Sequence, residues 1–468
     1  MTMTETSLRT PVGTVVGHRV DGVRRYLGIP YAEAPIGVRR FAPPVPRAPF
    51  RQPYDATRPG PTSQRVPLFA TTTIPEPSIP GDDVLNVSVT VPEADGCPVL
   101  VWIHGGGFLA GSPASPWYDG RSFARAGVVT VTVGYRLGVD GFAVLDGVPR
   151  NLGLRDVLLA LDWVQENIAA FGGDPARVTV AGQSAGGAAV LALLSSPAAR
   201  GRFRRAVSIS GGFFEGTHPE VARPTREFLA RLGRALAVPP TRAGFADRTL
   251  EQLQRAVLDL RGPGPLPLGP FVGDDILPVP VAEGLKEYGH DVPLLLGATG
   301  DEFDGDRTPA EEQGDGTRPA PEDRSAGTHT ARAARAAGTR PTDTLFRAVC
   351  PRSAAARRHA SAGTWLYSFE WPSPVLGGAV HCVDLPFFFD LLDASGVPEA
   401  LGPNPPTDLA TRMHADLVGF VHGETPPWDR ATGTPGDPAR EYGRPGAPLA
   451  ADTHGVYDPV TRTEAAPW

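Results

Sequence analysis

A serine between small residues stands where a predicted strand turns into a predicted helix. Residues 182–186 read Gly-Gln-Ser-Ala-Gly, between an apolar run at 178–181 and a helical run at 185–194. This is the context in which a G-x-S-x-G motif exposes a nucleophilic serine, because small residues two places to either side avoid a collision in the sharp turn. The sequence therefore predicts that Ser184 is a nucleophile. A glycine-rich turn with an incidental serine is the competing interpretation.

Three consecutive glycines provide a second signal for the same chemistry. Residues 104–107 read His-Gly-Gly-Gly and follow a strand predicted at 99–103. Glycines let backbone amides approach a developing oxyanion that side chains would block. The helix that begins at Ala185 also points backbone N–H groups toward that place. A triple glycine alone could be a flexible turn, but together with the first motif it favours acyl transfer to Ser184.

The elements that position these motifs alternate between strand and helix. Continuous apolar, β-branched runs at 99–103 and 128–133 are typical of strands buried on both faces of a parallel sheet. A helical period at 154–171 lies between them and the next strand. The alternation predicts an α/β fold with a central, mostly parallel sheet and helices on both faces. An antiparallel ribbon is expected at 13–26, further strands at 205–209, 292–296 and 365–369, and a further helix at 409–421.

The composition excludes several classes of protein. Hydrophobic residues make up 41% of the 468 residues, which is enough for a large core and excludes wholesale disorder. Lys and Arg number 44 against 51 Asp and Glu, so the net charge is −7 and no basic footprint for nucleic acid or anionic lipid is expected. No apolar run reaches the roughly 18 residues of a membrane span, and no signal peptide is recognised at the N-terminus.

Cysteine usage bears on the compartment. The three cysteines, Cys97, Cys350 and Cys382, are widely spaced and odd in number, which is no disulfide framework. We therefore expect a soluble, unsecreted protein of the reducing cytoplasm. Lys286 is the single lysine, and Ala, Gly, Pro and Arg are abundant, which is typical of a GC-rich genome.

One stretch breaks the pattern of the chain. Residues 304–344 contain no Val, Ile, Leu, Met or aromatic residue. Such a stretch buries too little apolar surface to offset the entropy of ordering it. We expect a mobile surface insertion there, within a single domain that spans 1–468.

These motifs resemble the type-B carboxylesterase family, the α/β-hydrolases that include bacterial para-nitrobenzyl esterases and cholinesterases. The resemblance is dense to about residue 303 and resumes from about 341. It implies an α/β-hydrolase fold with an irregular helical cap. Besides the two glycine-containing motifs, the matching segments are Leu-Gly-Ile-Pro-Tyr-Ala at 27–32, Gly-Tyr-Arg-Leu-Gly at 134–138, Asn-Leu-Gly-Leu-Arg-Asp at 151–156, Phe-Gly-Gly-Asp-Pro at 171–175 and Ser-Ile-Ser-Gly at 208–211.

The resemblance implies the other two members of a triad. The acid is Glu302, after the strand predicted at 292–296, and the base is His381. Acyl transfer needs such a pair, because the histidine takes the serine proton and the carboxylate stabilises the imidazolium. Asp301 and Asp304 are close along the chain, but consecutive residues leaving a strand point to opposite faces, which favours Glu302 over Asp301.

The resemblance also implies the oxyanion donors and a supporting residue. The donors are the backbone N–H groups of Gly106, Gly107 and Ala185. Ser210 is implied as a hydrogen-bonding support of the triad. A hydroxyl that only completes the end of a strand is an equally good interpretation of Ser210.

The sequence departs from the family pattern at several places. Ser63 and Val84 stand where many relatives have a cysteine pair, and the loop between them lacks a tryptophan. In cholinesterases a tryptophan in this loop binds the quaternary ammonium group of the substrate by cation–π attraction. Since the loop has no tryptophan here, choline esters are not the expected substrates. Phe303 follows the acid where a glycine is usual.

The sequence therefore predicts a hydrolase of carboxylic esters that acts through an acyl-Ser184 intermediate, without a metal ion or an organic cofactor. A small-molecule ester is the expected partner, nucleic acid and membranes are not, and the oligomeric state is open. An amidase or carbamate hydrolase with the same triad is an alternative, because leaving-group preference lies in the shape of the pocket. A catalytically silent binding protein is a second alternative, although such proteins usually lose a triad residue and all three positions are filled here.

Overall fold

The computed structural model describes residues 4–69, 72–212, 222–262, 266–303 and 343–461. Its strands are β1 (Thr4–Thr10), β2 (Gly13–Val20), β3 (Val23–Pro30), β4 (Tyr54–Asp55), β5 (Asn86–Val91), β6 (Cys97–Ile103), β7 (Val129–Val133), β8 (Gly173–Gln183), β9 (Arg205–Ile209), β10 (Leu294–Thr299), β11 (Thr364–Phe369), β12 (Pro438–Tyr442) and β13 (Ala450–His454). Within these described ranges they form one 13-stranded sheet in the order β1-β2-β3-β5-β7-β6-β8-β9-β10-β11-β12-β13, with β4 paired to β2.

The middle of this sheet is parallel and its two ends are antiparallel. Every neighbouring pair from β7 through β12 is parallel. The strands β1, β2, β3, β5 and β7 pair antiparallel in turn, as do β12 and β13. All residues of β6 and β7 are buried, as continuous apolar strands covered on both faces should be. The predicted parallel core and antiparallel N-terminal ribbon are confirmed.

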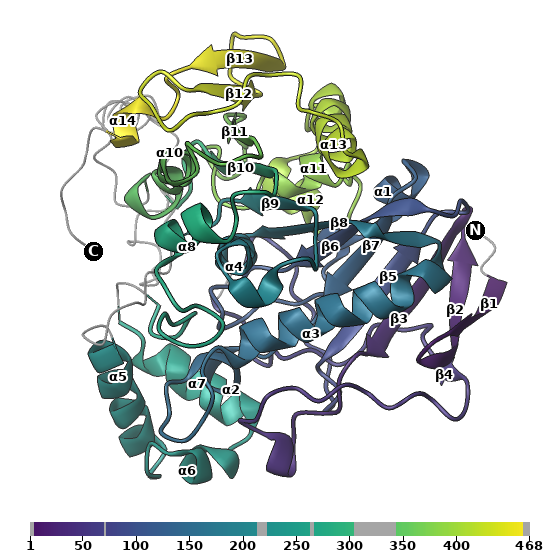
Figure 1. The fold of residues 1–468 in the computed structure, drawn as a ribbon, viewed down its shortest axis with the longest axis vertical. Coiled ribbons are helices and arrows are strands. Elements are labelled where there is room, and N and C mark those ends of the chain that lie inside the picture. Colours follow the sequence, from purple (N-terminus) through teal and green to yellow (C-terminus); the bar gives the residue numbers. More distant parts are fainter. Residues whose placement is uncertain (1–3, 70–71, 213–221, 263–265, 304–342, 462–468) are drawn as a thin grey trace, which may run out of the picture.

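Helices cover both faces of the sheet (Figure 1). The helices are α1 (Arg121–Arg125), α2 (Gly138–Phe142), α3 (Leu152–Asn167), α4 (Ala185–Leu194), α5 (Ala222–Ala235), α6 (Arg242–Ala246), α7 (Leu250–Leu260), α8 (Val281–Glu287), α10 (Val349–Ala356), α11 (Leu385–Phe388), α12 (Val397–Leu401), α13 (Thr407–His422) and α14 (Asp458–Thr461), with a π-helical turn η6 (Asp343–Arg347) and 3-10 turns at Gly37–Arg39, Pro116–Tyr118, Ile168–Phe171 and Pro197–Ala199.

Alternate residues of β6 show how the two faces divide the core. Val101 and Ile103 pack in a cluster that includes residues of α3 and α4. Leu100 and Trp102 point to the opposite face, into a cluster that includes residues of α1, α11 and α13. Because side chains alternate along a strand, one apolar run supplies both cores.

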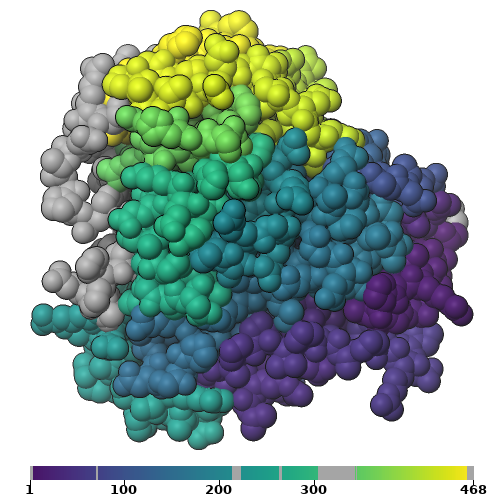
Figure 2. All heavy atoms as spheres, in the orientation of Figure 1, coloured from purple at the N-terminus to yellow at the C-terminus, as the bar shows by residue number. Residues whose placement is uncertain are grey.

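Helices α5, α6 and α7 gather at one end of the molecule, where α7 contacts α2 and α5 (Figure 1). In the space-filling view, the C-terminal strands close the opposite end and the N-terminal strands lie along one side (Figure 2). These three helices come from the segment between β9 and β10, whereas α8 from the same segment contacts α4 and α10.

The predicted element boundaries differ from the observed ones by a few residues. The helix expected at 154–171 ends as α3 at Asn167 and continues as a 3-10 turn. The strand expected at 292–296 begins only at Leu294, after Pro293, which has no N–H to donate to a neighbouring strand. The expected insertion at 304–344 lies outside the described residues except for its last two positions, so it stays a prediction.

A buried ion pair joins two of the motif segments. Asp156 accepts hydrogen bonds from the Arg136 side chain through both oxygens, at 2.6 and 2.8 Å, and from the Arg136 backbone N–H at 3.0 Å. Arg136 Nη1 also donates to the carbonyl of Ala42 at 2.7 Å. Both charged groups are buried. This paired geometry satisfies two charges that would be costly to bury alone.

We predict that Asp156→Asn destabilises the fold strongly. The substitution keeps the size of the side chain but leaves the buried Arg136 guanidinium without its counter-charge, which costs about 3–5 kcal/mol of unfolding free energy. Denaturant unfolding followed by circular dichroism measures the loss. Glu227→Gln is the matched control, because Glu227 pairs with Arg223 on the exposed face of α5. Equal unfolding midpoints for the two variants would contradict the prediction.

Candidate active site

The turn between β8 and α4 holds Ser184 in a strained conformation. Ser184 has φ 57° and ψ −122°, a region that residues with a side chain rarely adopt. A Cβ atom added to Gly182 would lie 2.5 Å from the backbone of Gly186, and one added to Gly186 would lie 2.0 Å from the carbonyl oxygen of Ile103. The two glycines therefore make the turn possible. The strand, turn and helix predicted around Ser184 are all present.

A hydrogen bond joins His381 to Glu302. His381 Nδ1 bonds to Glu302 Oε2, and the backbone N–H of His381 donates to the carbonyl of Glu302 at 2.8 Å. The other carboxylate oxygen accepts from the N–H of Thr299 at 2.9 Å. Glu302 is only 1% exposed, so water does not compete for these bonds. A carboxylate at Nδ1 fixes the proton there and leaves the lone pair on Nε2 to act as a base.

The neighbouring aspartate points elsewhere. Asp301 Oδ2 accepts from the backbone N–H of Ala379 at 2.7 Å. The structure therefore brings Glu302, and not Asp301, to the imidazole. Asp304 lies outside the described residues.

The second ring nitrogen of His381 has a neighbour that the sequence did not reveal. Gln183 Nε2 lies 3.0 Å from His381 Nε2. In the part of the chain that the structure describes, this amide is the hydrogen-bond partner of Nε2, rather than the hydroxyl of Ser184. Gln183 occupies a variable position of the G-x-S-x-G motif, so the motif gives no signal for it.

The glycine loop lies against Ser184. A Cβ atom added to Gly105 would lie 3.1 Å from Cβ of Ser184, and one added to Gly106 would lie 2.1 Å from the carbonyl oxygen of Ala110. Gly106 and Gly107 both have positive φ, 109° and 62°. Only glycine fits this close approach, and the loop thus comes to the serine with its backbone bare, as an oxyanion site requires.

His104 holds this loop and is not a competing base. Its ring stacks on Tyr135 with centroids 4.5 Å apart, its Nδ1 is 2.8 Å from the carbonyl oxygen of Gly105, and its own carbonyl accepts from the Tyr135 hydroxyl at 2.8 Å. Burial lowers the pKa of His104 to about 4. The imidazole is therefore neutral near pH 7 and serves the loop as a structural element.

The remaining predicted site residues lie at the same end of the sheet. Ala185 is buried at the first position of α4, directly after the serine. Ser210 follows β9, whose last residue, Ile209, accepts a hydrogen bond from the N–H of Ser184 at 2.9 Å. The Ser210 hydroxyl is buried and has no hydrogen-bond partner among the described residues, so its supporting role stays a prediction.

Two aromatic rings enclose His381. The Phe303 ring stacks on the imidazole with centroids 4.5 Å apart and an interplanar angle of 29°. The Phe346 ring, from η6, lies 5.0 Å from the imidazole and 5.5 Å from Phe303. Phe303 is 51% exposed, so one side of it covers the histidine and the other faces solvent. The phenylalanine that replaces the usual glycine thus contacts the predicted base.

The neighbours of His381 and its burial have opposite effects on the pKa of the imidazole. Burial lowers the pKa of this imidazole, but the interactions with Cys382 and Glu302 outweigh burial and raise the pKa well above 6.5. The Cys382 thiol is one neighbour, yet burial raises the pKa of this thiol and keeps it neutral near pH 7. The Glu302 carboxylate is therefore the partner that holds the proton on the ring.

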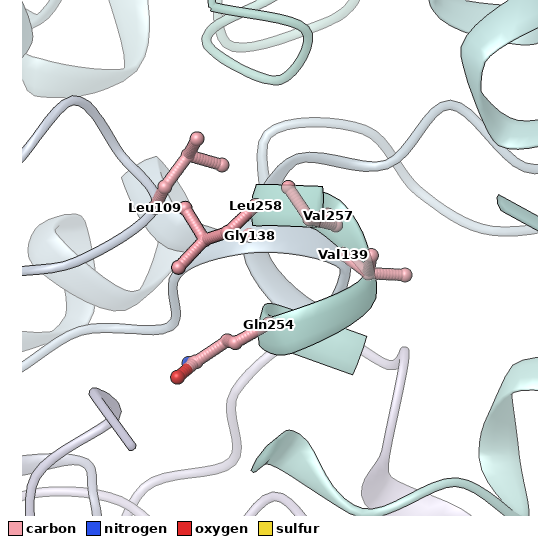
Figure 3. Close-up of a pocket in the computed structure, with 6 residues that line it drawn as sticks. All are labelled: Leu109, Gly138, Val139, Gln254, Val257 and Leu258. Atoms are coloured by element: carbon pink, nitrogen blue, oxygen red, sulfur yellow. The ribbon is translucent and has the colours of Figure 1, made fainter. Parts of the chain in front are cut away.

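The described residues contain neither a group of metal-binding side chains nor a membrane-spanning helix. No three His, Cys, Asp or Glu side chains gather there in a group that could hold a metal ion. No described helix combines the length and apolar character needed to cross a bilayer. A cavity of about 10 Å³ between α2, α7 and Leu109 has room for about one water molecule (Figure 3). It is lined by Leu109, Gly138, Val139, Gln254, Val257 and Leu258.

Comparison with known proteins places the chain in a family. The model of the Carboxylesterase family matches residues 4–317. The chain belongs to the carboxylesterase family. A para-nitrobenzyl esterase of Bacillus subtilis (strain 168) is 35% identical over 422 residues, which cover 84% of each protein. A phenmedipham hydrolase of Pseudarthrobacter oxydans is 32% identical over 496 residues, which cover 95% of this chain and 96% of the relative.

Solved structures agree with this assignment. A PNB esterase superposes with a TM-score of 0.79 at 29% identity, over 96% of this chain and 97% of that one. A carboxylesterase of Geobacillus stearothermophilus gives 0.77 at 31% identity, over 98% of both chains. The predicted α/β-hydrolase fold and the predicted family are confirmed, and this carboxylesterase is a hydrolase of carboxylic esters.

We predict that Glu302→Gln lowers kcat about 10³- to 10⁴-fold, as loss of the buried carboxylate does in other triads. The neutral amide no longer favours the proton on Nδ1. Because a charge that raises the pKa of His381 is gone, the acid limb of kcat/KM should move to lower pH. Initial rates across pH, with folding checked by circular dichroism, measure both effects.

Asp301→Asn is the matched control for Glu302→Gln. Its carboxylate bonds the backbone of Ala379 and not the imidazole. We expect a loss of less than about tenfold, because a removed backbone contact costs about one hydrogen bond. If Asp301→Asn were the crippled variant, Glu302 would not be the acid.

We predict that Phe303→Leu moves the acid limb of the esterase to lower pH by about half a unit. The face of an aromatic ring stabilises a cation by about 0.5–1 kcal/mol at a partly exposed site, so removing the ring lowers the pKa of His381 while leucine keeps an apolar cover. The pH profile of kcat/KM measures the shift. Phe50→Leu, which removes a ring stacked on Tyr54 at 4.6 Å, is the control that should leave the profile unchanged.

Proposed function

We propose that Ser184, His381 and Glu302 form the triad with which this carboxylesterase cleaves its substrates. The observation that carries the proposal is the hydrogen bond between Glu302 and the buried imidazole, whose Nε2 lies against the residue directly before a strained serine. A nucleophile, a base and an acid that orients the base are the parts that acyl transfer to serine needs.

In the first half of the reaction, Ser184 Oγ attacks the ester carbonyl carbon and His381 Nε2 takes the serine proton. The carbonyl oxygen becomes negative and is stabilised by the backbone N–H groups of Gly106, Gly107 and Ala185. When the tetrahedral intermediate collapses, the bond to the alcohol oxygen breaks and His381 returns the proton to that oxygen. The products of this half are the free alcohol and an acyl ester of Ser184.

In the second half, water replaces the alcohol. His381 Nε2 removes a proton from the water while its oxygen attacks the acyl carbon, and the same backbone N–H groups stabilise the oxyanion. Collapse of this intermediate breaks the bond to Ser184 Oγ, which recovers its proton from His381. The carboxylic acid leaves, and Glu302 keeps the imidazole in one orientation throughout.

The choice of substrate within the family is open. The relatives named above are a para-nitrobenzyl esterase and a phenmedipham hydrolase, which shows that similar chains serve different substrates. An amidase or carbamate hydrolase with the same triad therefore remains the second candidate function, since the shape of the pocket and not the triad selects the leaving group. Rates on a panel of chromogenic esters with increasing acyl length, beside matched amides and carbamates, would separate the two.

We place the enzyme in a reducing compartment such as the cytoplasm. Cys97, Cys350 and Cys382 are free thiols, which supports this location. We also propose that residues 1–468 form one catalytic domain with an insertion at 304–344. The expected partner is a small-molecule ester, with neither nucleic acid nor a membrane involved.

We predict that an organophosphate adds one phosphoryl group to Ser184 and stops turnover. The activated serine attacks phosphorus as it attacks a carbonyl, and the leaving group departs with the electron pair of the broken bond. Intact mass and peptide mapping locate the label. Ser184→Ala should take up no label and lose several orders of magnitude in kcat.

Ser361→Ala is the control for the labelling experiment. Ser361 is exposed and donates to the carbonyl of His290, and it is not part of the turn between β8 and α4 that holds Ser184. This variant should be labelled and inhibited like the wild type. Label on any residue other than Ser184, or full activity of Ser184→Ala, would refute the proposed triad.

A further inference from the structure

The side chain of Gln183 is buried between the base and the oxyanion loop. Gln183 is the last residue of β8 and is 0% exposed. Its amide nitrogen lies 3.0 Å from His381 Nε2 and 3.2 Å from Cys382 Sγ. Its amide oxygen faces the glycine loop, where a Cβ atom added to Gly105 would lie 2.7 Å from it. One neutral side chain thus touches the ring atom at which the proton is exchanged.

The hydrogen bond to Nε2 depends on the protonation state of the ring. Because Glu302 holds a proton on Nδ1, Nε2 of the neutral imidazole is a lone pair that accepts from the Gln183 amide N–H. Once His381 has taken the serine proton, Nε2 carries a hydrogen of its own. Two donors then face each other, unless the amide turns and presents its oxygen.

The amide oxygen is available for that second state. Gln183 Oε1 is buried and has no hydrogen-bond partner among the described residues. An unpartnered buried oxygen is unfavourable in the resting protein, and an apolar side chain of the same length would avoid it. The oxygen gains a partner when the amide rotates by a half-turn and Nε2–H donates to it.

We propose that Gln183 is a positioning residue that follows the proton on His381. In the resting enzyme its amide donates to Nε2 of the neutral imidazole. It makes a half-turn as the Ser184 hydroxyl takes over that lone pair, and its oxygen then shares Nε2–H of the imidazolium with the substrate oxygen until His381 returns the proton, in both halves of the reaction. This inference rests on the proposed triad. The groups that face His381 are then the Glu302 carboxylate, the Cys382 thiol, the nearby Asp384 carboxyl and the neutral amide of Gln183.

Two substitutions of Gln183 test the proposal. Gln183→Met keeps the length of the side chain but can neither donate nor accept, so kcat should fall about three- to tenfold with KM within about twofold. Gln183→Glu presents an acceptor that carries a charge, which stabilises the imidazolium. The acid limb of kcat/KM should therefore move to higher pH by about one unit or more, with kcat largely retained above the limb.

Gln165→Met is the matched control, because the Gln165 amide donates to the carbonyls of Pro175 and Arg202 on the outside of α3. It should leave both kcat and the pH profile as in the wild type. A wild-type kcat and profile in Gln183→Met would overturn the inference, and so would an unmoved acid limb in Gln183→Glu. If Gln183→Met does not fold, the position of the acid limb in the kcat/KM profile of Gln183→Glu tests the inference by itself.

Failure of this inference and failure of the triad give different results. Labelling of wild-type Ser184 by an organophosphate tests the triad without any change at Gln183. If Ser184 is labelled and the Gln183 variants behave like the wild type, the inference is wrong and the triad stands. If Ser184 is not labelled, both are wrong.

Discussion

The hydrogen bond between Glu302 and His381 is the interaction on which the rest of the site depends. These two residues are 79 positions apart, and they are joined by their side chains and by a backbone hydrogen bond of 2.8 Å. Glu302 follows β10, which lies between β9 and β11, and Ser184 follows β8, which pairs with β9 on its other side. The carboxyl ends of parallel strands meet at one edge of a sheet, so Ser184 and Glu302 leave the sheet at the same edge, and the hydrogen bond brings His381 to that edge.

A second buried carboxyl lies near this pair and changes its electrostatics. Asp384 is 0% exposed, and burial together with the Glu302 charge raises its pKa to about 7. The Tyr367 hydroxyl donates to Asp384 at 3.4 Å, a weak bond that does little to offset burial. Below pH 7 Asp384 is mostly neutral, and Glu302 is then the carboxylate whose charge favours the imidazolium. Above pH 7 Asp384 gains charge and adds to that effect, which couples the two carboxyls through one imidazole.

Features with a local sequence signal were predicted, and features that depend on packing were not. The turn at Ser184 follows from two glycines and the elements on either side, and buried parallel strands follow from continuous apolar runs such as 99–103. Glu302 and His381 came from the resemblance to a family, since no local rule pairs residues so far apart. Gln183 stands at a variable motif position, and the contact of Phe346 with His381 arises only when η6 packs beside β10. Such contacts depend on side-chain positions in the folded chain, which periodicity does not describe.

The contacts of Phe303 and Phe346 fix the chain just after Glu302 and the chain in η6 to the same imidazole. The two rings lie 5.5 Å apart and both contact His381, so the described chain reaches the imidazole just after Glu302 and returns to it within η6. Because Phe303 and Phe346 both contact His381, the length of the chain between these two phenylalanines does not set the position of Glu302. The entropy of closing a loop also grows only slowly with its length. The geometry of the pair therefore depends on β10, on the backbone bond between Glu302 and His381, and on the two rings.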